Sequence, residues 1–260
     1  MGKQSADIVI IGGGASGLMA AAGAAGRFAA DGKEARVIVL EKMARPGRKI
    51  MITGKGRCNF TNVKPWNEFS GHIHPKPNFL KHSFYNLTSE GMIDFLENNG
   101  TETIVERGDR AFPASHLASD IVDALVRAAE SAGAEIHCGK EVAEISRDEE
   151  NFTIECSDGN LYTCRKLIVC TGGLSYPKTG STGDGYVWAR HFGHTVKPLF
   201  PSLTAIVPKG YKEDAPAGDM KGHINRNTIL TETGESLCGN QLKNVSLRIF
   251  IDGNLAAEEF

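Results

Sequence analysis

The chain has 260 residues, a formal net charge of −2 and 41% hydrophobic residues, which is enough for one large or two modest domains. Its 29 Lys and Arg are balanced by 31 Asp and Glu. Because affinity for polyanions needs a basic excess, we expect neither a nucleic-acid nor a membrane partner. No apolar run approaches the ~20 residues of a membrane span and no secretory signal is visible, so we expect a cytoplasmic location.

The N-terminal residues predict a strand, a turn, a helix and a second strand. Residues 6–11 are apolar and β-branched, as in a strand buried inside a parallel sheet. Residues 12–17 are rich in glycine, and residues 18–28 are rich in alanine and predict a helix. Residues 36–41 predict another buried strand. This order is typical of a βαβ unit.

The turn matches the pattern G-x-G-x-x-G at Gly12, Gly14 and Gly17. In such turns the first glycine permits a tight bend, the second lets a pyrophosphate approach, and the third lets the helix pack closely. Glu41 ends the second strand, 24 residues after Gly17 (41 − 17). A carboxylate there accepts hydrogen bonds from ribose hydroxyls and repels a 2′-phosphate. The pattern predicts a dinucleotide site for an unphosphorylated ribose.

A long polar loop follows the second strand, at residues 46–62. Ordered loops of this length in compact domains are usually functional. In a plain nicotinamide dehydrogenase the βαβ units would continue directly. Here the loop suits an extended cofactor, with Arg48, Lys49 and Arg57 near phosphates and Asn59 and Thr61 near a polar ring. A solvated basic loop is the alternative interpretation, but the loop favours FAD over NAD.

The rest of the first 195 residues continues the α/β pattern. Short helices are expected at residues 77–86 and 88–99, the second capped by Thr88. A longer helix should end near Ala132 and be capped by Ser115 or Ser119. Asp184, at the start of a helix at 183–192, is either its N-cap, which we favour, or a second acid of a phosphate loop. Strands are expected at residues 103–107, 135–138, 142–147, 152–156, 161–164 and 167–171.

The composition changes after Pro198 to Pro-rich and then strand-like segments. We therefore divide the chain into a Rossmann-like domain at residues 1–195 and the beginning of a β-rich, substrate-side domain at residues 196–260. Residues 255–260 carry no stop signal. We expect the chain to be a portion of a longer protein.

Several strings in the chain resemble one family of flavoproteins. They are GGGASGLMAA, LEK, GRKIMITGKGRCNFTN, RAFPASHLASDIVDAL and TGGLSYPKTGSTGDGY, which begin at residues 12, 40, 47, 110 and 171. In these strings the chain resembles the N-terminal portion of the BaiN-like and aminoacetone oxidase family of NAD(P)/FAD-dependent oxidoreductases. The resemblance implies an α/β, Rossmann-like FAD-binding domain of the two-dinucleotide-binding-domain flavoprotein type, with the start of an inserted β-rich domain.

The resemblance also implies which residues contact FAD. The diphosphate, the adenosine and the flavin side would be held by Gly12, Gly14, Ala15, Ser16, Gly17, Glu41, Lys42, Arg48, Lys49, Gly54, Arg57, Cys58, Asn59, Thr61, Val142, Thr171, Gly172 and Gly173. Lys55 stands where relatives often carry glycine. A positive φ at that position would strain the backbone.

The chain is therefore expected to be an FAD-dependent oxidoreductase that transfers hydride to or from flavin N5. Its substrate would be a small organic molecule, such as an amine, an aminoketone or an unsaturated ketone, and NAD(P)H is a possible transient donor. We expect no metal site, and we expect a structural role for Cys58. The catalytic residues and the oligomeric state stay unassigned. The alternatives are an FAD-binding accessory or tRNA-modification-related flavoprotein without its own substrate, and an NAD-linked dehydrogenase.

Overall fold

A computed structural model describes residues 2–201, 210, 212–214, 228–237 and 246–259. Its contacts divide the chain into two units, Met1–Val196 and Lys197–Phe260. In the second unit, β10 (Lys212–Asp214) pairs with β11 (Thr228–Leu230), α7 spans Glu232–Leu237, and β12 (Leu247–Ile251) pairs with β13 (Asn254–Glu259). That this unit begins an inserted substrate-side domain stays a prediction.

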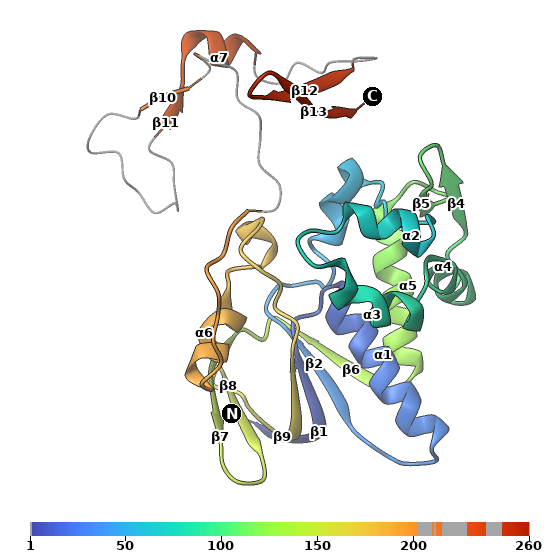
Figure 1. Cartoon of the computed structure of the whole chain (residues 1–260). Helices are drawn as coiled ribbons and strands as arrows, with labels where there is room; N and C mark the ends of the chain where they lie inside the picture. The colour runs from blue at the N-terminus through green and yellow to red at the C-terminus, as the bar shows by residue number, and fades with distance from the viewer. Residues whose placement is uncertain (1, 202–209, 211, 215–227, 238–245, 260) are drawn as a thin grey trace. The chain divides into compact units, whose positions relative to one another are not determined.

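The first unit is built on a six-stranded mixed sheet of order β6-β2-β1-β9-β8-β7 (Figure 1). The parallel strands are β1 (Lys3–Ile11), β2 (Val37–Glu41), β6 (Ala134–Cys138) and β9 (Leu161–Val169). The antiparallel strands are β7 (Val142–Arg147) and β8 (Phe152–Cys156). Every residue of β2 is buried, as expected for a strand inside a covered parallel sheet.

The two strands expected at residues 161–164 and 167–171 are a single strand, β9. The first half of β9 pairs with β8 as a hairpin, while β1 pairs with β9 from Leu161 to Val169. The long partner β1 supplies backbone hydrogen bonds across the polar pair Arg165 and Lys166, so the strand is not interrupted there. The division of this region into two strands was therefore wrong.

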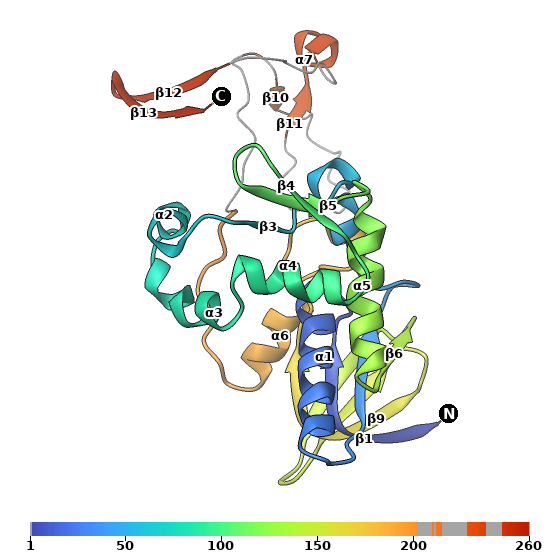
Figure 2. The same ribbon diagram turned by 90° about the vertical axis from the view of Figure 1, so that its right-hand side faces the viewer.

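Helices α1 (Ala15–Ala30) and α5 (Ala118–Ser131) lie side by side on one face of the sheet (Figures 1 and 2). Small side chains of α1, including Ala21 and Ala25, pack on β2 and allow the helix to approach closely. On the opposite face, Trp188 of α6 (Asp184–His191) packs against the core residues. Helices thus pack on both faces of the sheet.

Two expected helix caps were wrong. The N-cap of α5 is Leu117, and neither Ser115 nor Ser119 caps that helix from the N-cap position. The N-cap of α6 is Gly183, with φ +88°, a conformation that favours glycine; Asp184 is the first helical residue. The cap at Thr88 is confirmed, since its Oγ1 accepts a hydrogen bond of 3.0 Å from Gly91 N.

A smaller region is inserted between β2 and α5. It contains a three-stranded sheet of β3 (Thr61–Asn62), β5 (Arg110–Pro113) and β4 (Thr103–Glu106). Helices α2 (Trp66–Phe69), α3 (Lys81–Asn86) and α4 (Ser89–Asn98) and the 3-10 turns η1 (Ile50–Gly56), η2 (Ser70–His72) and η3 (Pro77–Leu80) surround it, while η4 (Pro177–Thr179) precedes α6. The expected short helices are thus partly 3-10 turns.

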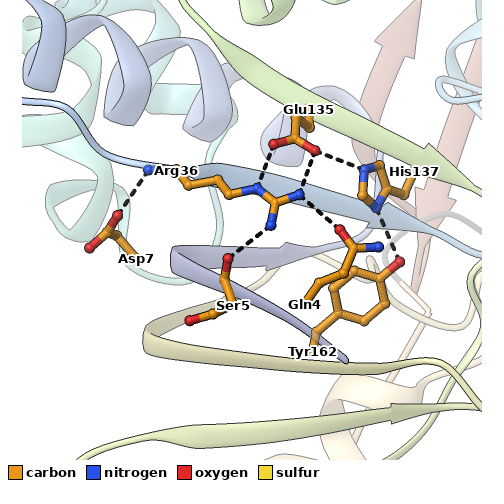
Figure 3. Close-up of polar contacts among 7 residues, drawn as sticks. All are labelled: Gln4, Ser5, Asp7, Arg36, Glu135, His137 and Tyr162. Carbon is orange, nitrogen blue, oxygen red and sulfur yellow. Dashed lines mark hydrogen bonds and ion pairs between the residues drawn. The ribbon is translucent and has the colours of Figure 1, made fainter. Parts of the chain in front are cut away.

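A polar cluster links residues of β1, β6 and β9 to Arg36, which directly precedes β2 (Figure 3). Arg36 donates from Nε to Glu135 Oε1 at 2.6 Å and from Nη2 to Glu135 Oε2 at 2.9 Å. Nη2 also donates to the Gln4 side chain at 2.8 Å, and the ring of His137 lies between Glu135 and Tyr162. This cluster ties the outer strand β6 to the centre of the sheet.

The Glu135→Gln substitution should lower the free energy of unfolding by about 1 kcal/mol at pH 7, because the pair is partly exposed and screened. The Arg36 guanidinium holds the pKa of Glu135 below its ordinary value of 4.5. The stabilisation is therefore complete above about pH 4.5 and lost as the pH falls toward the lowered pKa. Urea unfolding from pH 7 to pH 3 checks this, with the exposed Glu149→Gln variant as control. A difference from the parent that does not shrink on acidification would contradict the expectation.

Candidate functional site

A cavity lies at the carboxyl ends of β1, β2 and β9, within the first unit. Open α/β sheets commonly bind ligands at this edge. The lining residues come from the glycine turn, the end of β2, the following loop, the junction of β6 and β7, and the segment that leads into and includes α6. They include Ile11, Gly12, Gly14, Ala15, Ser16, Leu40, Glu41, Lys42, Gly47, Arg48, Lys49, Ile50, Thr53, Lys140, Val142, Cys170, Thr171, Gly172, Thr179, Gly180, Ser181, Asp184 and Trp188.

The three glycines of the turn have different surroundings. A Cβ atom on Gly12, which has φ +105°, would lie 2.4 Å from the carbonyl oxygen of Cys170. A Cβ atom on Gly17 would lie 1.8 Å from the carbonyl oxygen of Gly12. A Cβ atom on Gly14 would have no protein atom within 4 Å. Packing therefore explains the first and third glycines, whereas the second borders open space in the cavity.

The same turn ends at the amino terminus of α1. Gly14 is the N-cap, its backbone is extended, and no side chain caps it. The first turn of α1 also carries no acidic residue. The first N–H groups of a helix lack intrahelical partners and carry a partial positive charge. They therefore suit an anionic ligand such as a diphosphate.

Glu41 lies at the edge of the cavity with its carboxylate held in place. Its Oε2 accepts a hydrogen bond of 2.7 Å from Gly13 N, and its Oε1 accepts one of 2.7 Å from Met43 N. Each carboxylate oxygen has a second acceptor position. The residue is buried, with 8% exposure. Glu41 is thus oriented and able to accept further hydrogen bonds, and its contact with a ribose stays a prediction.

Two lysines connect the β2 side of the cavity to the segment before α6. Lys42 Nζ donates to Thr182 Oγ1 at 2.6 Å and pairs with Asp184 Oδ2 at 2.8 Å. Lys49 Nζ donates to Ser181 Oγ at 2.7 Å, and burial lowers the pKa of this lysine. Because a hydroxyl is neutral, the charge of Lys49 is not cancelled by Ser181. The cavity lining therefore includes both this cation and the amino terminus of α1.

The Lys49→Met variant should weaken FAD binding by about tenfold to a hundredfold, since a hydrogen bond to a charged group contributes about 1.5–3 kcal/mol. Methionine retains the apolar stem, so the fold should be unaffected. Quenching of flavin fluorescence during titration of the apoprotein measures the affinity. The exposed Lys33→Met variant is the control. Equal affinity in the two variants would remove Lys49 from the cofactor site.

The residues of the G-R-C-N string, at positions 56–59, make their contacts within the inserted region. The guanidinium of Arg57 pairs with Glu106 and lies over the Phe112 ring, 4.3 Å from its centroid. Asn59 Nδ2 donates to the carbonyl oxygen of Ala111 at 2.9 Å, which fastens the loop to β5. Cys58 is buried with 4% exposure, and burial raises the pKa of its thiol. A protonated, buried thiol fits the structural role expected for Cys58.

The structure brings together eleven of the predicted cofactor residues in the cavity lining. These are Gly12, Gly14, Ala15, Ser16, Glu41, Lys42, Arg48, Lys49, Val142, Thr171 and Gly172. It places the others outside that lining, namely Gly17, Gly54, Arg57, Cys58, Asn59, Thr61 and Gly173. Contacts of this second group with a cofactor stay predictions. Lys55 has φ +57°, a conformation that costs a side-chain-bearing residue about 1–2 kcal/mol.

Several lining residues were not expected from the sequence. Ser181 and Gly180 belong to the string TGGLSYPKTGSTGDGY, which pointed to this region without indicating which residues face the cavity. Asp184, in the same string, was considered as a phosphate-loop acid only as the second choice, and it also lines the cavity. Trp188 and Lys140 lie in no motif. Among the described residues there is no group of three or more His, Cys, Asp or Glu side chains arranged to hold a metal ion. The described helices include none that is long and apolar enough to cross a membrane.

Comparison with known proteins gives one family and several relatives. The family described as HI0933-like protein Rossmann domain matches residues 6–250. A ribosomal RNA dihydrouridine synthase of Escherichia coli (strain K12) is 35% identical over 204 residues, which cover 78% of this chain and 47% of that protein. A 3-dehydro-bile acid delta(4,6)-reductase of Clostridium scindens is 31% identical over 236 residues, which cover 88% of this chain and 55% of that protein.

The chain spans about half the length of the curated relatives that it matches. A solved structure of Sdh1 from Mycobacterium smegmatis in the apo form aligns with a TM-score of 0.51 and 18% identity, over 73% of this chain and 39% of that one. At this level of identity the likeness shows the fold alone, and it agrees with the Rossmann-like sheet described above.

Proposed function

This chain belongs to the HI0933-like family of FAD-binding Rossmann proteins, and on that premise we propose that it is part of an FAD-dependent oxidoreductase that saturates a carbon–carbon double bond conjugated to a carbonyl group. The observation that carries the cofactor assignment is the open space beside Gly14. Nearby backbone atoms leave no room for a side chain at Gly12 or Gly17, but Gly14 is bordered by the cavity. A glycine there is explained by a ligand that approaches the backbone.

The donor set around this space suits the diphosphate and adenosine parts of FAD. The amino terminus of α1 and Lys49 would hold the diphosphate, and Glu41 would accept from the ribose. Glu41 disfavours a 2′-phosphorylated ribose. FAD satisfies these requirements, and it supplies the redox chemistry that the described side chains of the cavity do not carry.

The reaction class follows from what the named relatives have in common. A dihydrouridine synthase saturates the ring double bond of uracil, and a delta(4,6)-reductase saturates ring double bonds of an oxo-steroid acid. In both substrates the double bond is conjugated to a carbonyl group. When bound and reduced, FAD would supply the hydride for the β-carbon, and a proton from solvent would reach the α-carbon, so that the product would gain two hydrogens and the flavin would be oxidised. We propose NAD(P)H as the donor that restores the reduced cofactor.

The substrate that carries this double bond is either a small ring ketone or a uracil within RNA. Two curated relatives are named for ribosomal RNA, including one from Haemophilus influenzae that is 32% identical over 93% of this chain. The expectation of no nucleic-acid partner rested on the near-neutral overall charge and on the lack of a basic stripe in the sequence, and it stays a prediction. The bile acid reductase supports the unsaturated ketone among the substrates expected above.

Purification of the full-length protein tests the proposal. The protein should be yellow, with absorbance near about 450 nm from bound FAD. Under anaerobic conditions NADH or NADPH should bleach that absorbance, and the faster of the two identifies the donor. A colourless protein that cannot be reconstituted with FAD would contradict the cofactor assignment. Failure of both nicotinamides to bleach the flavin would contradict the proposed donor.

A further inference from the structure

The segment at residues 63–89, which contains α2 and α3, is exposed on the first unit (Figure 2). None of the residues from 66 to 86 is buried, although many of them are aromatic or aliphatic. Four rings hold the segment together: Phe84 lies 5.2 Å from Trp66, 5.3 Å from Phe69 and 5.6 Å from Tyr85, centroid to centroid. The segment thus has a fixed shape while its outer side chains face solvent.

Four large apolar side chains of this segment are exposed, and together they are called the apolar patch. Phe79 is 85% exposed and Tyr85 is 58% exposed, and the nearby Leu80 and Leu87 are 42% and 43% exposed. Exposed apolar side chains that gather in one place commonly mark an interaction site. Phe79 in particular contributes almost nothing to the interior, so packing within the described residues does not explain an aromatic ring at this position.

The charge of the segment differs from that of the rest of the chain. Residues 63–89 contain three lysines, three histidines and one glutamate, which gives +2 with neutral histidines (3 − 1). The remaining residues therefore carry −4 (−2 − 2). Lys64 is neutralised by Glu68 at 3.1 Å and Asp109 at 3.3 Å. The exposed Lys76 and Lys81 stand on either side of Phe79 in the sequence.

We propose that this segment binds single-stranded RNA. Bases would stack on Phe79 and Tyr85, and Lys76 and Lys81 would neutralise the adjoining phosphates. Proteins that hold single strands combine exposed aromatic rings with cations in this way. The proposal rests on the proposed function and deepens it, because it selects uracil in RNA as the carrier of the double bond.

A membrane surface fits the same residues less well. Helix α3 has only six residues, of which only Phe84 and Tyr85 are apolar. Membrane-surface helices need a longer continuous apolar face.

The overall charge of −2 does not reveal this local basic segment, because the acidic residues in the rest of the chain outnumber the basic ones.

Fluorescence anisotropy of the full-length protein with a labelled oligouridylate of about 12 nucleotides tests the proposal. The Phe79→Ala variant should weaken binding by about fivefold to a hundredfold, as expected for loss of one stacked base. Lys76→Gln and Lys81→Gln should each reduce the slope of log affinity against log salt by about 0.7. Phe200→Ala removes a ring that is 82% exposed outside the segment, and it should leave RNA affinity unchanged.

The outcomes separate this proposal from its rivals. Equal RNA affinity in the Phe79→Ala and Phe200→Ala variants would overturn it. Loss of binding to phosphatidylglycerol vesicles, without any effect on RNA, would assign the patch to a membrane and overturn it. Conversion of a dimer to a monomer by Phe79→Ala, with RNA affinity unchanged, would assign the patch to a second copy and overturn it.

The FAD content of the same variants keeps the two proposals distinguishable. Phe79 lies outside the cavity lining, so Phe79→Ala should retain the absorbance near about 450 nm. A yellow protein without RNA affinity would contradict the RNA surface and leave the flavin assignment intact. A colourless protein that binds RNA through Phe79 would contradict the flavin assignment and leave the surface intact.

Discussion

The Gly14→Val variant of the full-length protein is expected to fold normally and to lose FAD. Its backbone at this position, with φ −82° and ψ −171°, is extended and open to any residue. A Cβ atom there meets no protein atom within 4 Å, so the protein itself leaves room for the first atom of a side chain. The added methyl groups instead occupy space that the diphosphate needs, and several charge-assisted hydrogen bonds of about 1.5–3 kcal/mol each are weakened together. The FAD affinity should fall by at least about a hundredfold.

Two measurements on one preparation check this expectation. The ratio of flavin to protein absorbance gives the FAD content, and thermal unfolding of the apoproteins gives the stability. The expected result is a nearly colourless variant whose apoprotein unfolds at the same temperature as the parent apoprotein. A yellow variant with unchanged affinity would show that the cofactor does not approach Gly14. Unfolding of the apoprotein at a much lower temperature would show that the position is structural.

The Gly17→Ala variant is expected to lose folding stability, in contrast to Gly14→Val, which is expected to fold normally and to lose FAD. A Cβ atom at this position would lie 1.8 Å from the carbonyl oxygen of Gly12, a backbone atom that cannot rotate away. The turn or the start of α1 must therefore move. Insertion of atoms into a packed interior costs about 1–3 kcal/mol and sometimes more. We expect a loss of about 3 kcal/mol or more in the free energy of unfolding, measured by urea titration of the apoprotein.

Gly23 provides the matched control in the same helix. It lies in the interior of α1, and a Cβ atom there would have no neighbour within 4 Å. Gly23→Ala should therefore stabilise the protein by about 0.5–1 kcal/mol, because alanine is the better helix former. Similar stabilities for Gly17→Ala and Gly23→Ala would contradict the packing role assigned to the third glycine of the turn.

The sequence predicted the cavity best where residue type and backbone geometry are coupled. The G-x-G-x-x-G spacing required a strand, a turn and a helix in a fixed order, and Glu41 had to end the neighbouring strand. The structure confirms that arrangement and places Gly12, Gly14 and Glu41 at one cavity. Thr88 was predicted correctly for the same reason, since a hydroxyl at an N-cap acts on its own helix.

Predictions failed where distant partners decide the outcome. Asp184 is of a residue type that often caps helices, but its carboxylate forms an ion pair with Lys42, which is far away in the sequence. Nor does local sequence show that β1 would extend β9 through Arg165 and Lys166. Arg57 suits a phosphate by its charge and is paired with Glu106 on β4, so its contact with a cofactor stays a prediction. Long-range contacts of this kind leave no periodic signal in a single sequence.

A single-turnover experiment tests the central proposal most directly. The full-length protein with bound FAD is reduced without oxygen and then mixed with a cyclic enone or with unmodified ribosomal RNA, while absorbance near about 450 nm is followed. The account predicts that one of these substrates restores the absorbance in proportion to its amount and gains about 2 Da, the mass of two hydrogens. If neither substrate reoxidises the flavin although oxygen does, or if the product mass is unchanged, the proposed reduction of a conjugated double bond is contradicted.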